Sequence, residues 1–170
     1  MNPNLAAPLG NSLESLMYGL SQLFLIPLMF TIALLFLYAF YALGAFSWQA
    51  LQRRRGRPDA FELLALQRAV PQLSSADLEA EAVTRLEFVR IVTRVAPMLG
   101  LVATMIPMGP ALKALGDGQL SDIASSLMQA FSAVILALIA SAITYAIAHV
   151  RRRWYARDLM LAERDAGVRP

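Results

Sequence analysis

The stretch "APMLGLVATMIPMGPAL" (residues 96–112) contains no charged side chain. It lies in a charge-free segment of 18 residues, 95–112, which just suffices to cross about 30 Å of hydrocarbon as a helix. A helix that only anchors a protein in lipid is well served by leucine, yet this stretch carries three prolines, two glycines and Thr104. Its composition therefore indicates a membrane span with a function beyond anchoring.

Two further charge-free segments flank this one: 38 residues at 15–52 and 28 residues at 123–150. Hydrophobic residues make up 58% of the chain, which exceeds the roughly 45–50% of soluble domains. The first segment would reach about 57 Å as one helix, too long for a single crossing. Pro27 offers a break, so we expect an amphipathic interfacial segment at 1–23 and a transmembrane helix at 24–52, with the span at about Phe24 to Ser47.

The distribution of arginine predicts the orientation. All arginines lie in 53–94 or 151–170, and the first 52 residues contain neither Lys nor Arg. By the positive-inside rule, the N terminus and the loop 113–122 lie outside, whereas 53–94 and 151–170 are cytoplasmic. The fold expected is an all-α integral membrane protein with three transmembrane helices, 24–52, 95–112 and 123–150, and cytoplasmic helical extensions.

The basic runs "RRRGR" (53–57) and "RRRW" (151–154) fit this topology, including contact with anionic headgroups, better than nucleic-acid binding. A secretory signal peptide is not expected, because no basic residue precedes the first apolar segment. The absence of cysteine excludes disulfides and thiol catalysis. We expect the lipid bilayer as a partner and no nucleic acid.

The aqueous segment 53–94 predicts two helices. The first covers 59–70, with Asp59 as N-cap and Pro71 as its end. The second covers 74–95, begins with a capping box between Ser74 and Asp77, and continues into the second span. In the outer loop 113–122, Gly116 and Gly118 give the backbone the freedom to turn. Ser121 or Asp122 can cap the third span. The helix at 151–170 extends the third span.

Small and polar residues form faces on the second and third spans. In the second span, helical spacing aligns Gly100, Thr104, Pro107 and Ala111. In the third span, alternating steps of four and three align small residues into a groove: Ser126, Ala130, Ala133, Ala137, Ala140, Thr144 and Ala148. Such a groove admits another helix closely. Ser125, Gln129 and Ser132 form a neighbouring polar face. For Gln129 together with Thr104, packing and pore lining both stay open.

The motif "LGLVAT" (99–104), the short outer loop and "LMQAFSAVILAL" (127–138) together resemble the TolQ/ExbB/MotA proton-channel family. The resemblance implies a pentamer around a dimer of a single-span partner that carries an intramembrane aspartate, like ExbD, TolR or MotB. It implies pore lining by Thr104, Gln129, Ser132, Ser125 and Pro107. Gly100 of the second span and the groove residues Ala130, Ala133, Ala137 and Ala140 then serve helix packing, and we expect the groove to hold neighbouring subunits together.

Three positions depart from the family pattern. Gln129 stands where ExbB-like members have a glutamate, Val134 replaces a second threonine, and Ala137 replaces a glycine. The prolines of the second span free backbone carbonyls, which neighbouring groups or cavity water must satisfy. An aspartate at mid-bilayer needs a polar lining, and an uncharged ring of Thr104 and Gln129 would supply it.

The function implied is an ion-conducting, stator-like subunit of a motor in the bacterial or archaeal cytoplasmic (inner) membrane, driven by protons or sodium. The alternative is a non-conducting membrane scaffold or transporter coupling subunit, which the loss of the glutamate favours. An enzyme is not expected, because the spans carry no charge and His149 is the single histidine. No cofactor and no metal site are predicted.

Overall fold

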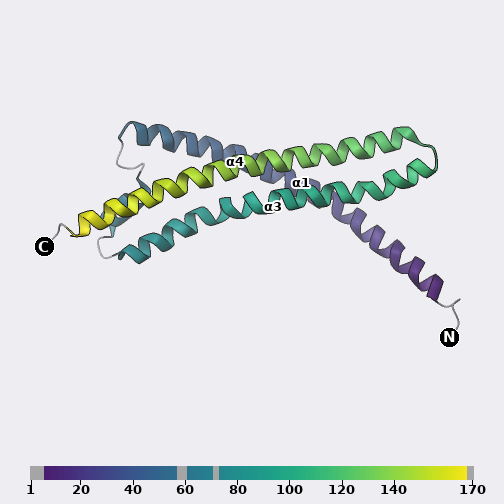
Figure 1. Ribbon diagram of the computed structural model, residues 1–170, viewed down its shortest axis with the longest axis horizontal. Helices are drawn as coiled ribbons and strands as arrows, with labels where there is room; N and C mark the ends of the chain where they lie inside the picture. The colour runs from purple at the N-terminus through teal and green to yellow at the C-terminus, as the bar shows by residue number, and fades with distance from the viewer. Residues whose placement is uncertain (1–5, 57–60, 71–72, 168–170) are drawn as a thin grey trace. The chain divides into compact units, whose positions relative to one another are not determined.

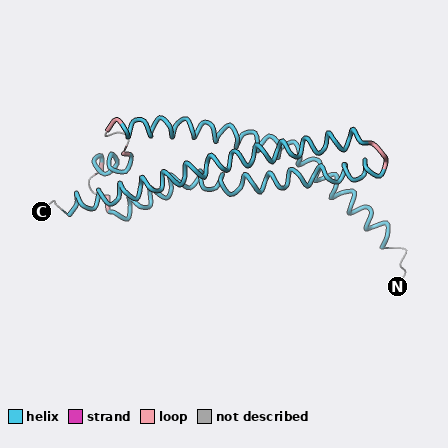
Figure 2. The backbone as a smooth tube through the Cα atoms, turned by 45° about the horizontal axis from the view of Figure 1, so that its top comes forward, coloured by secondary structure: helices cyan, strands magenta, loops and turns pink. Residues whose placement is uncertain are grey.

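A computed structural model describes residues 6–56, 61–70 and 73–167 of the 170-residue chain. Its regular elements are four helices, α1 (Ala6–Arg54), α2 (Glu62–Ala69), α3 (Ser75–Gly116) and α4 (Leu120–Gly167), and these residues include no strand (Figures 1 and 2). Three of the helices, α1, α3 and α4, are long and apolar enough to cross a membrane. The predicted all-α membrane fold is therefore confirmed.

The chain divides into two compact units, and each long helix contributes a segment to both. The apolar unit comprises Met1–Leu35 and Pro97–Leu138. The arginine unit comprises Phe36–Ala96 and Ile139–Pro170 and contains every arginine of the chain. The candidate pore residues fall in the first unit, and the basic runs in the second.

Helix α1 continues through Pro27 without the expected break. A proline removes only one helical hydrogen bond, and its fixed φ is compatible with helix, so the surrounding residues hold the conformation. Only 11% of the most apolar window of α1 is buried, and large side chains such as Leu23 and Ile26 are exposed. Exposed apolar surface of this extent is stable in lipid rather than in water. The interfacial role of 1–23 stays a prediction.

Helix α2 fills the space between α3 and α4 in the arginine unit. Leu63 of α2 is fully buried in a cluster with Ala82 and Leu86 of α3 and Tyr155 of α4. The helix begins at Glu62, and Phe61 precedes it without a side-chain cap. The predicted cap Asp59 and the predicted helix end Pro71 lie outside the described residues.

The predicted capping box at the start of α3 is confirmed. The amide and hydroxyl of Ser74 donate to Asp77 Oδ2 at 3.0 and 2.8 Å, and the Asp77 amide donates back to Ser74 Oγ at 3.2 Å. These bonds from Ser74 lower the pKa of the exposed Asp77 carboxyl below its ordinary value. From this cap, α3 runs uninterrupted past Pro97, Pro107 and Pro110.

The connection between α3 and α4 is shorter than the expected loop 113–122. Helix α3 ends at Gly116 and α4 begins at Leu120, because Gly118 turns the chain at a φ of +74°. Of the two glycines expected to turn the chain, only Gly118 has positive φ. Ser121 and Asp122 lie inside the first turn of α4, so their predicted capping role is wrong.

Candidate functional site

The small residues of α4 are buried inside the subunit. Five positions of the predicted groove are covered: Ala130, Ala133, Ala137, Ala140 and Thr144. In the apolar unit, Ala133 and Ala137 pack with Ile32 of α1 and Ala103 of α3. A Cβ built on Gly100 would lie 3.0 Å from Ala137 Cβ, closer than side chains ordinarily approach. Glycine at position 100 therefore permits the close approach of α3 to α4.

The prediction that this groove holds neighbouring subunits together is wrong, because helices of the same chain cover it. The groove is already occupied by α1 and α3 of the same chain, so another subunit cannot enter it without displacing them. Sequence periodicity identifies a face that packs closely, but it does not say which helix fills it. The stripe stabilises the three-helix arrangement within one subunit.

The carbonyl of Thr93, which Pro97 leaves without its helical amide, has a partner in α4. Proline lacks the amide that would bond to the carbonyl of Thr93, four residues earlier. Ser141 Oγ donates to that carbonyl at 2.8 Å. In addition, Thr93 Oγ1 lies 3.2 Å from Thr144 Oγ1, which bonds to the Ala140 carbonyl at 2.8 Å. The prediction that neighbouring groups satisfy carbonyls freed by proline is confirmed for Pro97.

The candidate pore residues differ in exposure. Thr104 is half-buried and donates to the Leu101 carbonyl at 2.6 Å, and Pro107 is buried. Ser125, Gln129 and Ser132 are exposed on α4. The two serine hydroxyls bond to carbonyls of their own helix, at 3.0 and 2.8 Å. A hydroxyl that donates to its own helix still has lone pairs to accept a hydrogen bond.

Within the described residues, no hydrogen bond joins Thr104 and Gln129. Thr104 is half-buried on α3, one turn beyond Gly100, whose position contacts Val134 and Ala137 of α4. Gln129 is exposed on α4, and its amide makes no hydrogen bond to another described side chain. A polar lining that uses both residues therefore leaves the Gln129 amide to water or to another subunit.

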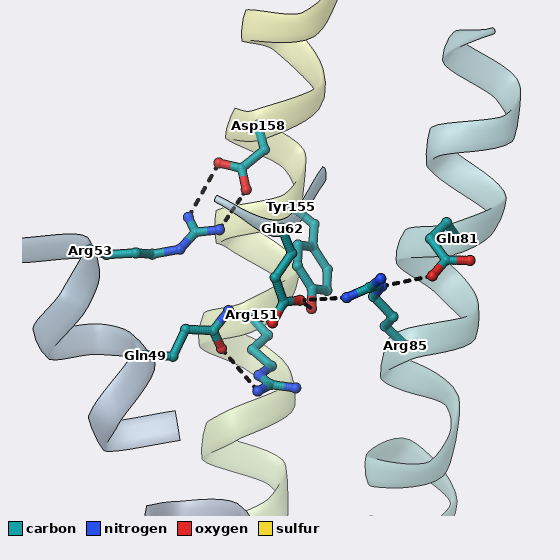
Figure 3. A network of polar contacts seen from close by, with 8 residues as sticks. All are labelled: Gln49, Arg53, Glu62, Glu81, Arg85, Arg151, Tyr155 and Asp158. Carbon is teal, nitrogen blue, oxygen red and sulfur yellow. Dashed lines mark hydrogen bonds and ion pairs between the residues drawn. The ribbon is translucent and has the colours of Figure 1, made fainter. Parts of the chain in front are cut away.

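The sequence reasoning missed a polar network in the arginine unit (Figure 3). Its centre is the carboxylate of Glu62 on α2, which accepts hydrogen bonds from all three long helices. Gln49 Nε2 of α1 donates at 2.8 Å, Arg85 of α3 at 3.2 Å, and the Tyr155 hydroxyl of α4 at 2.7 Å. Glu62 thereby ties α2 to each long helix through one side chain. Burial and this carboxylate raise the pKa of Tyr155.

A buried ion pair lies beside Glu62. The guanidinium of Arg53 donates to both carboxylate oxygens of Asp158, at 3.2 and 2.5 Å, and the Asp158 side chain is 1% exposed. The same guanidinium lies over the rings of Phe61 and Trp154, 4.8 and 4.7 Å from their centroids. Burial raises the pKa of Asp158 while Arg53 opposes that shift. The pair joins the ends of the first and third apolar helices.

One pattern in the sequence could have indicated this network. Arg151 belongs to the network because it donates to Gln49 Oε1 at 2.9 Å. Arg151, Tyr155 and Asp158 are spaced by four and three residues, so they share one face of α4. A basic run beside a membrane span ordinarily fixes topology, and that interpretation hid the buried acid. The described residues contain no cluster of three His, Asp or Glu side chains that could hold a metal ion.

Comparison with known proteins identifies the family to which this chain belongs. A search of curated proteins and a search of solved structures found no significant match. The family model of the MotA/TolQ/ExbB proton channel family matches residues 44–164, which include all of α2 and α3, most of α4 and the end of α1. The match covers well over half of the chain, including both spans that carry the candidate pore residues. This multi-pass membrane protein therefore belongs to the MotA/TolQ/ExbB proton channel family.

Proposed function

We propose that the protein is an ion-conducting, stator-like subunit of a motor in the bacterial or archaeal cytoplasmic membrane. The ion is a proton or sodium, and the motor drives a single-span partner. The observation that carries the proposal is the family match over 44–164, together with the absence of charge from 95–112 and 123–150. The role is coupling of ion movement to protein movement, without a chemical reaction.

The proposed assembly is a pentamer around a dimer of partner helices. Thr104 lies at the edge of the buried face of α3, and Ser125, Gln129 and Ser132 are exposed on α4. Hydroxyls and amides left on the surface of a membrane helix favour a wet cavity or a subunit contact over lipid. This distribution supports a lining assembled from several subunits.

The proposed ion carrier is an aspartate on the partner's single span. No Asp or Glu occurs in 123–150, and Gln129 stands where ExbB-like members carry an acid. A charged aspartate at mid-bilayer costs about 2.5–3.5 kcal/mol or more, so it must face polar groups. Uncharged hydroxyls and amides accept and release an ion without holding it as strongly as a fixed charge would.

A second candidate is a non-conducting scaffold or a coupling subunit of a transporter. Gln129 favours it, because an amide cannot take up and release a proton near neutral pH. Under this alternative, the buried alanines and the Glu62 network maintain a rigid platform for a partner. The two candidates differ in whether ions cross.

Ion flux distinguishes them. The protein is reconstituted into proteoliposomes with its membrane partner, and flux is measured for the wild-type pair and for a partner whose intramembrane Asp is changed to Asn. We expect ion flux from the wild-type pair and none from the pair with the Asn variant. We expect the conducting particles to contain five copies of this chain. Intact particles that pass no ions would favour the scaffold.

The proposed orientation has its own test. The chain contains no cysteine, so Asp117→Cys and Arg55→Cys each introduce a single label site. With an impermeant thiol reagent, we expect Asp117→Cys to label from outside the cell and Arg55→Cys only after the membrane is opened. Labelling of both from the same side would overturn the three-span topology.

A further inference from the structure

The arginine unit contains a basic hollow between α3 and α4 whose side chains the proposed function does not use. It has a volume of about 350 Å³ and is lined by Leu86, Arg90, Thr93, Arg94, Tyr145, Ala148, His149 and Arg152. Three arginines and the single histidine of the chain meet there, and no residue of this lining is acidic. The hollow thus concentrates positive charge.

The arginines of this hollow form no ion pair with another described residue. Within the described residues, no carboxylate lies in ion-pair contact with Arg90, Arg94 or Arg152, in contrast to Arg53 and Arg85. All three side chains are exposed. Guanidinium groups that converge without a carboxylate repel each other, and an anion between them removes that repulsion. The lining is therefore suited to an anionic ligand.

The position of the hollow indicates where that anion comes from. Arg94 is the last charged residue before the charge-free segment 95–112, and Arg151 and Arg152 are the first after 123–150. The hollow therefore lies where the apolar spans end, at the depth of phospholipid headgroups. Tyr145, which is 62% exposed, lies on its wall with its ring stacked on His149, as is typical of aromatic residues at a membrane interface.

We propose that this hollow binds the phosphate of an anionic phospholipid headgroup. Arg90, Arg94 and Arg152 would donate charge-assisted hydrogen bonds to the phosphate oxygens, and a guanidinium can do so with two parallel N–H groups. Ala148 and the Tyr145 ring, which lie on the membrane side of Arg152 along α4, supply apolar wall for the glycerol and the first acyl carbons. The proposal does not depend on whether the protein conducts ions.

Adjacent arginines on α4 provide a matched test. Arg152 lines the hollow, whereas Arg153 is exposed and is not part of its lining. Arg152→Gln and Arg153→Gln remove the same charge one residue apart. Phosphatidylglycerol is added to the detergent-solubilised protein against a phosphatidylcholine background, and bound lipid is counted by native mass spectrometry. We expect Arg152→Gln to weaken phosphatidylglycerol binding about fivefold, the effect of one arginine near an anionic surface.

The triple variant Arg90→Gln, Arg94→Gln, Arg152→Gln should lose selectivity for phosphatidylglycerol, while Arg153→Gln binds like wild type. Equal weakening by Arg152→Gln and Arg153→Gln would reduce the effect to general surface charge and overturn the site. Competition by inorganic phosphate at the lipid's own concentration would assign the hollow to free phosphate instead. Dissociation of the oligomer by Arg152→Gln would make the arginines a subunit contact, which also contradicts the proposal.

Discussion

The hydroxyl of Ser141 on α4 donates a 2.8 Å hydrogen bond to the carbonyl of Thr93 on α3, the carbonyl that Pro97 leaves without its helical amide. The serine in α4 thus supplies the hydrogen-bond donor that the proline in α3 removes. A partly buried carbonyl without a donor destabilises the helix, so the serine lets α3 keep its proline. The pair also fixes the register of the two helices at this level.

Replacement of Ser141 by Ala should destabilise the subunit by about 1 kcal/mol, because the Thr93 carbonyl loses its donor. In a Pro97→Ala background the new amide at position 97 can bond to Thr93, so Ser141→Ala should then cost much less. The free energy of unfolding in mixed micelles, compared across this double-mutant cycle, measures the difference.

Ser132→Ala is the matched control for this cycle, since among the described residues Ser132 bonds only to the Met128 carbonyl of its own helix. It should leave the unfolding free energy nearly unchanged. An equal cost of Ser141→Ala with and without Pro97 would show that the serine does not compensate the proline.

Gly100 should tolerate no side chain as long as Ala137 faces it. Gly100→Ala places a Cβ 3.0 Å from Ala137 Cβ, and both helices must separate to relieve the contact. Overpacking of this kind costs about 1–3 kcal/mol. Thermal unfolding should show the loss, and the exchange Gly100→Ala with Ala137→Gly should recover much of it. Gly44→Ala, whose Cβ would meet nothing within 4 Å, should be neutral or stabilising; a similar loss there would refute the packing explanation.

The Arg53–Asp158 pair should depend on the shape of the guanidinium as well as on its charge. Arg53→Lys keeps the charge but loses the two-pronged bond to Asp158 and the contacts of the guanidinium with the rings of Phe61 and Trp154. Asp158→Asn leaves a largely buried arginine without its counter-charge and should cost about 3–5 kcal/mol. In chemical denaturation, Arg53→Lys should lie between wild type and Asp158→Asn. Indistinguishable unfolding of Arg53→Lys and the exposed control Arg55→Lys would contradict this.

The charges and the small residues predicted much of the fold. Charge-free segments located the three spans, and the Ser74–Asp77 pattern located the start of α3, because both depend on residues close in sequence. The packing partner of the alanine stripe could not be read the same way, since α1 and another subunit offer the same apolar surface. The Glu62 network was also hidden, because it joins residues as far apart as Gln49 and Tyr155. Pro27 misled because a single proline costs a long helix only one bond.

The central claim, that Thr104 lines an ion path through its hydroxyl, is tested most directly by ion flux in proteoliposomes that hold this chain and its partner. Thr104→Ser keeps the hydroxyl and should retain much of the flux, whereas Thr104→Val keeps the shape and should assemble normally yet lose most of it. Packing alone predicts the reverse order, because Ser loses a methyl group and Val nearly preserves the volume. Particle size checks the assembly of each variant. Equal flux in wild type and Thr104→Val would contradict the pore-lining role and leave Thr104 as a packing residue.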